Sequence, residues 1–294
     1  MTNILKTMEQ LVLLADSGST KTDWAIINPT DKKAVPFRVF TQGINPFHQS
    51  EEAIRSVLKD ELLSHMGRMG EKVGRIRYYG SGVTPEKEPF MCRVLAETFP
   101  EATSIEAHGD LLGAARALCG NNEGLACILG TGSNSCFYDG SQIVKNTPPL
   151  GYVLGDEGSG AVIGRRLLNA LYKGLLGEDV KVLFESWAGV NMAEAVNHVY
   201  RQPLPNRWLA SLTVFVADNI KCPGMEQLVV DNFRDFIRLN VNPYDRHDLP
   251  LNAVGSIAYF FRAQLDQAGR AEGYRLGLVM KSPMEGLIQV EQLR

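Results

Sequence analysis

Residues 16 to 22 bring a carboxylate, several hydroxyls and a lysine into one short turn. Asp16 follows the apolar run Leu11–Ala15, and a second apolar run begins at Trp24. A strand, turn and strand of this kind point successive backbone N–H groups into one concavity, which binds anions. Asp16 suits Mg²⁺ because this ion takes few carboxylates and keeps several waters. We therefore predict a metal–nucleotide site with Asp16 at the metal and with Ser17, Gly18, Ser19, Thr20 and Lys21 at the phosphates.

A related turn follows the apolar run Leu125–Leu129 and precedes Cys136–Tyr138, which is typical of a strand. Neither turn matches the Walker pattern, and neither is a dinucleotide fingerprint because no helix is expected directly after it. Two such turns in one chain predict a duplicated unit with a nucleotide held between the copies. The phosphate-binding candidates of the second turn are Thr131, Gly132 and Ser133.

Asp110 follows the predicted strand Ser104–Ala107 and opens the predicted helix Leu111–Cys119. One interpretation is a helix N-cap, a position at which Asp is common. The other is a general base at the end of a strand, which would accept a proton from a substrate hydroxyl. A cap position is also an exposed position, so both interpretations stay open.

Polar residues also follow other predicted strands. Asn45 and Ser81 lie in glycine-containing turns, and each could be a plain turn residue. Asp156 lies among the glycines of Gly155–Gly160, where backbone could approach a ligand closely. We expect Asn45, Ser81 and Asp156 to lie with Asp110 at the substrate. Gly255 and Ser256 either start a helix or let an adenosine approach the backbone.

The first half of the chain predicts strands separated by helices. Apolar positions recur at helical spacing from Ala53 to Leu63, and Ser50 is a candidate N-cap. The expected strands are Leu11–Ala15, Asp23–Ile27, Phe37–Thr41, Arg75–Tyr79 and Ser104–Ala107, and two more helices are expected at Pro89–Phe99 and Leu111–Cys119.

The glycine-rich segment Gly120–Gly124 separates two predicted domains, 1–119 and 120–282. In the second, the expected strands are Leu125–Leu129, Ser135–Tyr138, Ile143–Lys145, Leu249–Val254 and Tyr274–Met280. A helical insertion is expected from 157 to 239 and a further helix at Ser256–Gln267. The last helix, within 283–294, is expected to pack back on the first domain.

Composition excludes several classes of protein. The chain has 294 residues, 45% of them hydrophobic, which is enough for two cores. A net charge of −3 argues against a nucleic-acid partner, whose site would be basic. No apolar run reaches the ~20 residues that span a bilayer, and Met1–Gln10 does not resemble a signal peptide. Five cysteines without a C-x-x-C pair suggest free thiols, so we expect a cytoplasmic protein with no membrane partner.

The motifs taken together resemble a known family. The segments Asp16–Thr22, Gly43–Pro46, Gly130–Asn134, Gly155–Ser159 and Val254–Ala258 are similar to the N-acetylglucosamine kinases and the related BadF/BadG/BcrA/BcrD ATPase-type proteins. These proteins belong to the acetate kinase–sugar kinase–Hsp70–actin superfamily. The resemblance runs from about residue 11 to Leu287. It implies an α/β protein with two ribonuclease H-like domains, the actin-like ATPase fold, and an interdomain cleft for ATP and sugar.

The resemblance also implies roles for residues. Asp110 matches the catalytic base, Gly255 and Ser256 would lie by the adenosine, and the two turns would hold the phosphates of ATP with Mg²⁺. Sugar-contacting positions are matched by Asn45, Ser81, Asn134 and Asp156. One departure is that the first turn often reads Gly-Gly-Gly-Thr in the family, whereas this chain has Ser17, Gly18, Ser19 and Thr20.

The first functional hypothesis is an ATP-dependent kinase that phosphorylates an amino sugar, with N-acetylglucosamine as the favoured substrate. Its partner would be this small-molecule sugar. The sequence leaves the oligomeric state open, with a homodimer as one option. The second is an ATPase that activates a partner protein, like the 2-hydroxyacyl-CoA dehydratase activators, which need cysteine ligands for an iron–sulfur cluster. The third is a non-catalytic sugar or nucleotide sensor of the same fold. A zinc-containing sugar kinase is disfavoured because the chain has no cysteine cluster.

Overall fold

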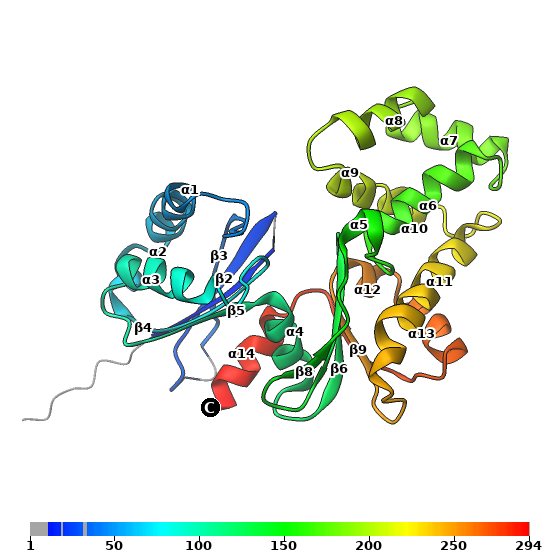
Figure 1. Cartoon of the computed structure of the whole chain (residues 1–294). Coiled ribbons are helices and arrows are strands. Elements are labelled where there is room, and N and C mark those ends of the chain that lie inside the picture. Colours follow the sequence, from blue (N-terminus) through cyan, green and yellow to red (C-terminus); the bar gives the residue numbers. More distant parts are fainter. Residues whose placement is uncertain (1–10, 19, 32–33, 294) are drawn as a thin grey trace, which may run out of the picture. The chain divides into compact units, whose positions relative to one another are not determined.

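The computed structural model of the chain describes residues 11–18, 20–31 and 34–293. The chain forms two compact units (Figure 1). Unit 1 contains Met1–Gly120 and Pro283–Arg294, and unit 2 contains Asn121–Ser282. The expected cleft between the domains stays a prediction.

Unit 1 is built on a mixed five-stranded sheet in the order β3-β2-β1-β4-β5. The first three strands along the chain are antiparallel neighbours, whereas β4 and β5 run parallel to β1. The strands are β1 (Leu11–Ser17), β2 (Lys21–Ile27), β3 (Phe37–Gln42), β4 (Val73–Gly80) and β5 (Ser104–Gly109).

Helices cover both faces of this sheet, which explains why β1 is apolar from Leu11 to Ala15. Leu13 and Ala15 pack into a cluster with apolar residues of the first helices and of α3. Val12 and Leu14, whose side chains point to the other face, pack into a cluster with α4 and α14. The helical elements are α1 (Glu51–Ser56), η1 (Val57–Leu63), α2 (Ser64–Met66), η2 (Gly67–Lys72), α3 (Glu88–Thr98), α4 (Asp110–Cys119) and α14 (Met284–Leu293).

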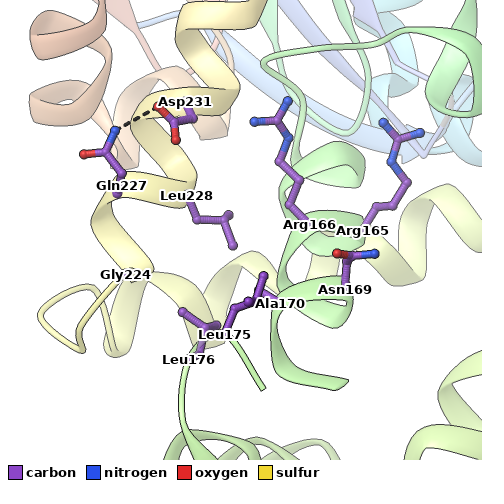
Figure 2. Close-up of a pocket in the computed structure, with 10 residues that line it drawn as sticks. All are labelled: Arg165, Arg166, Asn169, Ala170, Leu175, Leu176, Gly224, Gln227, Leu228 and Asp231. Carbon is purple, nitrogen blue, oxygen red and sulfur yellow. Dashed lines mark hydrogen bonds between the residues drawn. The ribbon is translucent and has the colours of Figure 1, made fainter. Parts of the chain in front are cut away.

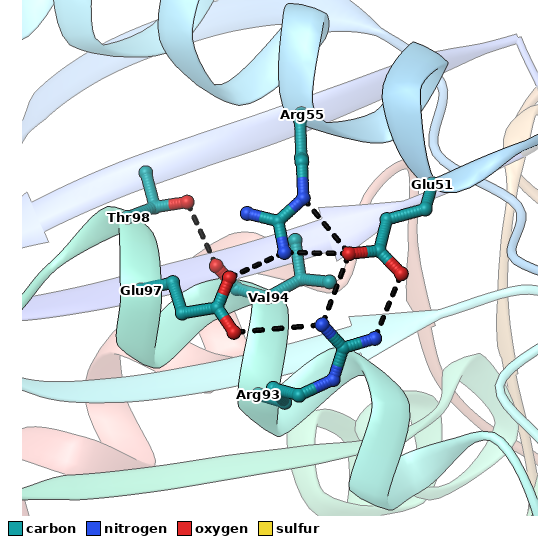
Figure 3. A network of polar contacts seen from close by, with 6 residues as sticks. All are labelled: Glu51, Arg55, Arg93, Val94, Glu97 and Thr98. Atoms are coloured by element: carbon teal, nitrogen blue, oxygen red, sulfur yellow. Dashed lines mark hydrogen bonds and ion pairs between the residues drawn. The ribbon is translucent and has the colours of Figure 1, made fainter.

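An exposed network of ion pairs joins α1 to α3 (Figure 3). The Glu51 carboxylate accepts hydrogen bonds from Arg55 Nε at 2.9 Å and from Arg93 Nη2 at 2.7 Å. Glu97 pairs with both arginines. Ser50 caps α1 by accepting from Ala53 N, as predicted. Since α1 follows the turn of Asn45, and α3 follows that of Ser81, the network ties together the helices behind both turns.

Unit 2 repeats the sheet topology of unit 1. Its five strands have the order β10-β9-β6-β7-β8, with β6, β7 and β8 antiparallel and β9 and β10 parallel to β6. The strands are β6 (Gly124–Leu129), β7 (Ser133–Tyr138), β8 (Ile143–Asn146), β9 (Leu251–Val254) and β10 (Leu276–Met280). This repetition confirms the duplicated unit that the two turns predicted.

The predicted helical insertion of unit 2 is confirmed, and its helices share one large apolar core with the sheet. The helices are α5 (Gly151–Leu154), α6 (Gly160–Tyr172), α7 (Glu178–Ala188), α8 (Met192–Arg201), α9 (Pro205–Ser211), α10 (Thr213–Asp218), α11 (Met225–Phe236), η3 (Ile237–Val241), η4 (Asn242–Tyr244), α12 (Ser256–Phe260) and α13 (Arg262–Ala271). Within the described residues, no helix combines the length and the apolar character needed to cross a membrane.

The single helix expected at Ser256–Gln267 is wrong. The chain leaves the helical conformation at Phe261, whose ψ is 33°, so that α12 ends and α13 begins there. The Phe261 side chain is 3% exposed in the core of unit 2, whereas that of Phe260 is 62% exposed. The break thus allows Phe261 to reach the core from a segment whose neighbour faces solvent.

Candidate active site

The carboxyl ends of three parallel strands lie side by side in unit 1. Ser17 of β1 pairs with Gly80 of β4, and Gly80 pairs with Gly109 of β5. Asp16 and Asp110 lie at the ends of the two outer strands of this trio, and the turn that contains Ser81 follows the middle one. The pairing therefore brings three of the predicted site residues to one edge of the sheet.

Asp110 is the first residue of α4 and not its N-cap, which corrects one of the two interpretations from the sequence. Gly109, with extended backbone at φ −61° and ψ 149°, occupies the cap position. The Asp110 carboxyl accepts a hydrogen bond from the N–H of Leu111, which lowers its pKa, but burial dominates and raises that pKa to about 6. A carboxylate with this pKa is deprotonated near neutral pH and still basic enough to accept a proton.

Asp16 has the more strongly raised pKa of the two. Burial is the main cause, the negative charges of Asp110 and Asp23 add to it, and the pKa reaches about 7. Lys21 and Arg38 act in the opposite direction. Arg38 is itself engaged, because its guanidinium donates to the Asp23 carboxylate from Nε at 2.9 Å. A cation beside Asp16 would relieve this excess of negative charge.

The first phosphate turn is closed by a hydrogen bond from Gly18 N to the Lys21 carbonyl at 3.0 Å. Thr20 and Lys21 are exposed, and the Lys21 ammonium lies 5.1 Å from the centre of the Phe40 ring. Ser19 lies outside the described residues. Thr20 also accepts a hydrogen bond from Gly43 N at 3.1 Å, so this turn contacts the segment that leads to Asn45.

The Ser17 hydroxyl is buried and engaged within unit 1, whereas the sequence predicted that Ser17 lies at the phosphates. Ser17 is 0% exposed. Its Oγ donates to the carbonyl of Ile44 at 3.0 Å, accepts from Ile44 N at 3.1 Å, and lies 2.7 Å from Oγ1 of the buried Thr22. The reason is tertiary: the segment after β3 folds over the end of β1 and supplies backbone partners for this hydroxyl.

Asn45 and Ser81 are brought together by Gly82. Gly82 has a φ of +77°, and a Cβ added to it would lie 2.0 Å from Asn45 Oδ1. Glycine is therefore needed both for the left-handed backbone and for the close approach of the Asn45 amide. Ser81 N donates to the carbonyl of Ser17 at 2.8 Å, which fixes the turn of Ser81 on β1.

The second phosphate turn is held against the start of α6. Gly160 N donates to the carbonyl of Gly130 at 2.8 Å, and Ala161 N donates to that of Thr131 at 3.2 Å. Thr131 is exposed and Ser133 is buried. These two hydrogen bonds hold the backbone of this turn against α6.

Asp156 lies beside this second turn, a contact that the sequence did not indicate. Its Oδ1 accepts a hydrogen bond from Ser133 N at 3.4 Å, and burial raises its pKa to about 6. The residue has a φ of +54°, an uncommon backbone conformation for which Asp and Asn are among the favoured side chains. Ser159 caps α6 by accepting from Val162 N, so capping does not account for Asp156.

Asn134 and Gly255 also lie near the second phosphate turn. Asn134 is in the strand that follows this turn, and Gly255 lies against Leu129, which precedes it. Asn134 Oδ1 accepts from Ser135 N at 2.9 Å and from Asn146 Nδ2 at 2.8 Å, which orients its amide. Gly255 is the N-cap of α12, and a Cβ added to it would lie 2.2 Å from the carbonyl of Leu129. Only glycine therefore allows this close approach to the strand before the turn. Ser256 is exposed at the first position of α12.

A separate cavity of about 560 Å³ lies between α6 and α11 in unit 2 (Figure 2). No predicted site residue lines it. Arg166 forms an ion pair with Asp235, and Arg165 Nη1 donates to the carbonyl of Tyr152 at 2.8 Å. Its two arginines already have protein partners, so we assign no ligand to this cavity.

Among the residues that the structure describes, no three His, Cys, Asp or Glu side chains gather as a ready-made set of metal ligands. The five cysteines, all within the described part of the chain, form no disulfide. Asp16 provides one carboxylate at the end of β1.

Comparison with known proteins gives matches among solved structures only, since no protein-family model and no curated protein matches this chain. A proposed N-acetylglucosamine kinase from Porphyromonas gingivalis is 45% identical, with a TM-score of 0.92 over 96% of this chain and 99% of that one. A proposed N-acetylglucosamine kinase from Chromobacterium violaceum is 19% identical, with a TM-score of 0.70 over 96% and 99% of the two chains. The ROK hexokinase of Thermus thermophilus is 15% identical, with a TM-score of 0.54 over 97% of each chain. The last two are similar in fold.

Proposed function

Because the chain belongs to the N-acetylglucosamine kinase family of sugar kinases, with the actin-like ATPase fold, we propose that it transfers the γ-phosphoryl group of ATP to a hydroxyl of an amino sugar. N-acetylglucosamine is the proposed substrate, since the Porphyromonas gingivalis relative is a proposed kinase for this sugar. We further propose that the protein acts in the cytoplasm on this small molecule and on neither nucleic acid nor membrane. The oligomeric state is open, and a homodimer stays an untested expectation.

The observation that carries the proposal is the position of Asp110. Its carboxyl group, with a pKa of about 6, lies at the same edge of the sheet as the turn of Ser81, and Gly82 joins that turn to Asn45. In the proposed step the sugar oxygen forms a bond to the γ-phosphorus while the bond to the bridging oxygen of ADP breaks. The hydroxyl proton passes to Asp110, and ADP leaves.

Asp16 would hold Mg²⁺ in this reaction. The donor fits: a single, partly exposed carboxylate with a raised pKa in a region of excess negative charge favours a hard cation that keeps its waters. When bound, Mg²⁺ would neutralise charge on the phosphates. Asp16 itself would orient the ion's waters from the end of β1.

The remaining predicted residues divide between nucleotide and sugar. We assign Thr20 and Lys21 of unit 1, and Thr131, Gly132 and Ser133 of unit 2, to the phosphates, where N–H groups, hydroxyls and an ammonium are suitable donors. Gly255 and Ser256 are assigned to the adenosine. Sugar hydroxyls are assigned to Asn45, Ser81, Asn134 and Asp156, because amide and hydroxyl groups can donate to and accept from a sugar hydroxyl, and a carboxylate can accept from it.

The test is a coupled assay of ADP release with purified protein, ATP and Mg²⁺. N-acetylglucosamine, glucosamine, glucose and N-acetylmuramic acid derivatives are compared with a control that contains no sugar. We expect ADP release that depends on sugar and is fastest with N-acetylglucosamine. Equal ADP release without any sugar would favour an ATPase activator, and sugar binding without turnover would favour a sensor.

A further inference from the structure

We infer that Tyr78 is a positioning residue for the sugar: its buried hydroxyl holds the carbonyl of Ile44 and thereby sets the place of Asn45 at the substrate. The inference rests on the proposed function and adds to it a residue that the sequence motifs do not include. Tyr78 lies on β4, beside Ala15 of β1, and is 0% exposed. Its hydroxyl donates to the Ile44 carbonyl at 3.3 Å.

Ile44 is held from two strands at once. Ser17 at the end of β1 exchanges two hydrogen bonds with the Ile44 backbone, and Tyr78 on β4 adds a third at the same carbonyl. Ile44 is also 0% exposed. The residue before Asn45 is therefore fixed to the strands whose ends carry Asp16 and the turn of Ser81.

Tyr78 adds a third hydroxyl hydrogen to the hydroxyl groups that surround the Ile44 carbonyl. Ser17 and Thr22 have one hydroxyl hydrogen each. These two hydrogens must serve three contacts: Ser17 with the Ile44 carbonyl, Ser17 with Thr22, and Thr22 with the Gln42 carbonyl. When Ser17 donates to Thr22, the Tyr78 hydroxyl, which also forms a hydrogen bond with Ser17, is the side-chain hydroxyl that can still donate to the Ile44 carbonyl. Burial raises the pKa of Tyr78 further above its ordinary value, so this hydrogen is retained at working pH.

The link continues from Ile44 to the Asn45 side chain. Asn45 Oδ1 accepts from Phe47 N at 3.0 Å, and Asn45 N donates to Gln49 Oε1 at 2.7 Å. Oδ1 is thus engaged within the turn, and the Nδ2 hydrogens are the donors that can meet a sugar oxygen. Because these hydrogen bonds fix the Asn45 side chain to its own turn, a shift of Ile44 would also shift the Nδ2 donor.

Tyr79 provides a matched control. It follows Tyr78 on β4 but faces the other side of the sheet, in the cluster with α4 and α14. It is 3% exposed, and its hydroxyl accepts a hydrogen bond from Arg116 Nη1 at 2.8 Å. Tyr78→Phe and Tyr79→Phe therefore each remove one buried hydroxyl from the same strand, and only the first removes a bond to Ile44.

The experiment compares steady-state kinetics of the parent, Tyr78→Phe and Tyr79→Phe, with N-acetylglucosamine and ATP varied separately. Loss of one hydrogen bond at the sugar turn should raise the KM for sugar by about threefold to tenfold in Tyr78→Phe. The KM for ATP should stay at the parent value. Tyr79→Phe should keep both KM values, whatever its effect on Tm.

Equal effects of the two substitutions, or equal changes in both KM values for Tyr78→Phe, would overturn the inference. If Tyr78→Phe does not fold, Tyr78→Leu takes its place, because it also removes the hydroxyl and keeps an apolar side chain in the core; an unchanged KM for sugar in that variant overturns the inference as well. A parent protein without sugar-dependent turnover would contradict the proposed function itself. Turnover in the parent with an unaltered sugar KM in the Tyr78 variant would contradict the positioning role alone.

Discussion

Asp110 lies close enough to Asp16 for its negative charge to raise the pKa of Asp16, in addition to the larger effect of burial. The two carboxyl groups lie at the ends of β1 and α4, across β4. Protons and a divalent cation would therefore compete for the Asp16 carboxylate. We expect both the activity and the stability of unit 1 to depend on pH for this reason.

The first prediction concerns that dependence. A carboxyl whose folded pKa is raised binds protons more tightly in the folded protein, so its contribution to stability is present below the unfolded pKa and is lost as pH rises through the folded value. For Asp16 this window runs from 3.8 to about 7. Asp16→Asn should therefore raise the Tm of the metal-free protein more at pH 8 than at pH 5, while Mg²⁺-dependent turnover falls. A Tm change of the same size at both pH values would contradict the raised pKa.

The second prediction concerns the proposed base. Asp110→Asn keeps the shape of the side chain at the first turn of α4 but removes the proton acceptor, so turnover should fall about 10²-fold to 10⁴-fold. ATP and sugar affinities, measured by calorimetry, should stay near those of the parent. In the parent, kcat should rise with pH around the Asp110 pKa of about 6, because only the deprotonated carboxylate accepts a proton. Near-full turnover in the variant would reduce Asp110 to a structural residue.

The third prediction concerns Asp156. Asp156→Asn keeps a side chain that tolerates the φ of +54° and removes the charge. The KM for sugar should rise about tenfold to a hundredfold if charge-assisted hydrogen bonds to sugar hydroxyls are lost. Asp245→Asn is the matched control, because Asp245 in unit 2 has the same φ of +54° and is not a predicted site residue. A rise in the KM for ATP alone would instead assign Asp156 to the phosphate turn that it contacts through Ser133.

The fourth prediction concerns the ion network of α1 and α3. Hydrogen bonds from Arg93 and then Arg55 lower the pKa of Glu51 to about 2, so the stabilisation is present above pH 4.5 and is lost as pH falls toward 2. Glu51→Gln should lower Tm slightly at low salt, and the difference from the parent should shrink as NaCl is added, because salt screens exposed charges. The same substitution at the exposed Glu71, outside the network, should have no such salt dependence.

Strands were the part of the fold that sequence patterns predicted best. The runs at Leu11, Leu125 and Phe37 became strands with ends within two residues of those expected, because short apolar or alternating segments bounded by turns have few other solutions. The break at Phe261 could not be predicted, since apolar residues continue at helical spacing across it. Packing of Phe261 into the core, and not local preference, ends α12.

The sequence predicted which polar residues lie at the ends of strands, and the structure shows which groups these residues contact. The Ser17 hydroxyl bonds Ile44, 27 residues away, and Asp156 bonds Ser133, 23 residues away. No local pattern reports contacts at such separations, because they depend on how the turns fold over the sheets. Asp110 lies one position after the N-cap of α4, because Gly109 has the extended backbone conformation that the N-cap requires.

The helix α14 completes unit 1 with the last residues of the chain. Its Met284, Leu287 and Ile288 close the cluster that covers Val12 and Leu14. During synthesis on a ribosome, all of unit 2 is therefore made before α14, the helix that completes unit 1. Unit 2 can fold as a continuous stretch of chain, whereas unit 1 has only α4 on this face of its sheet until α14 is made. Synthesis of unit 1 thus begins first, but unit 2 is the first of the two whose chain is complete.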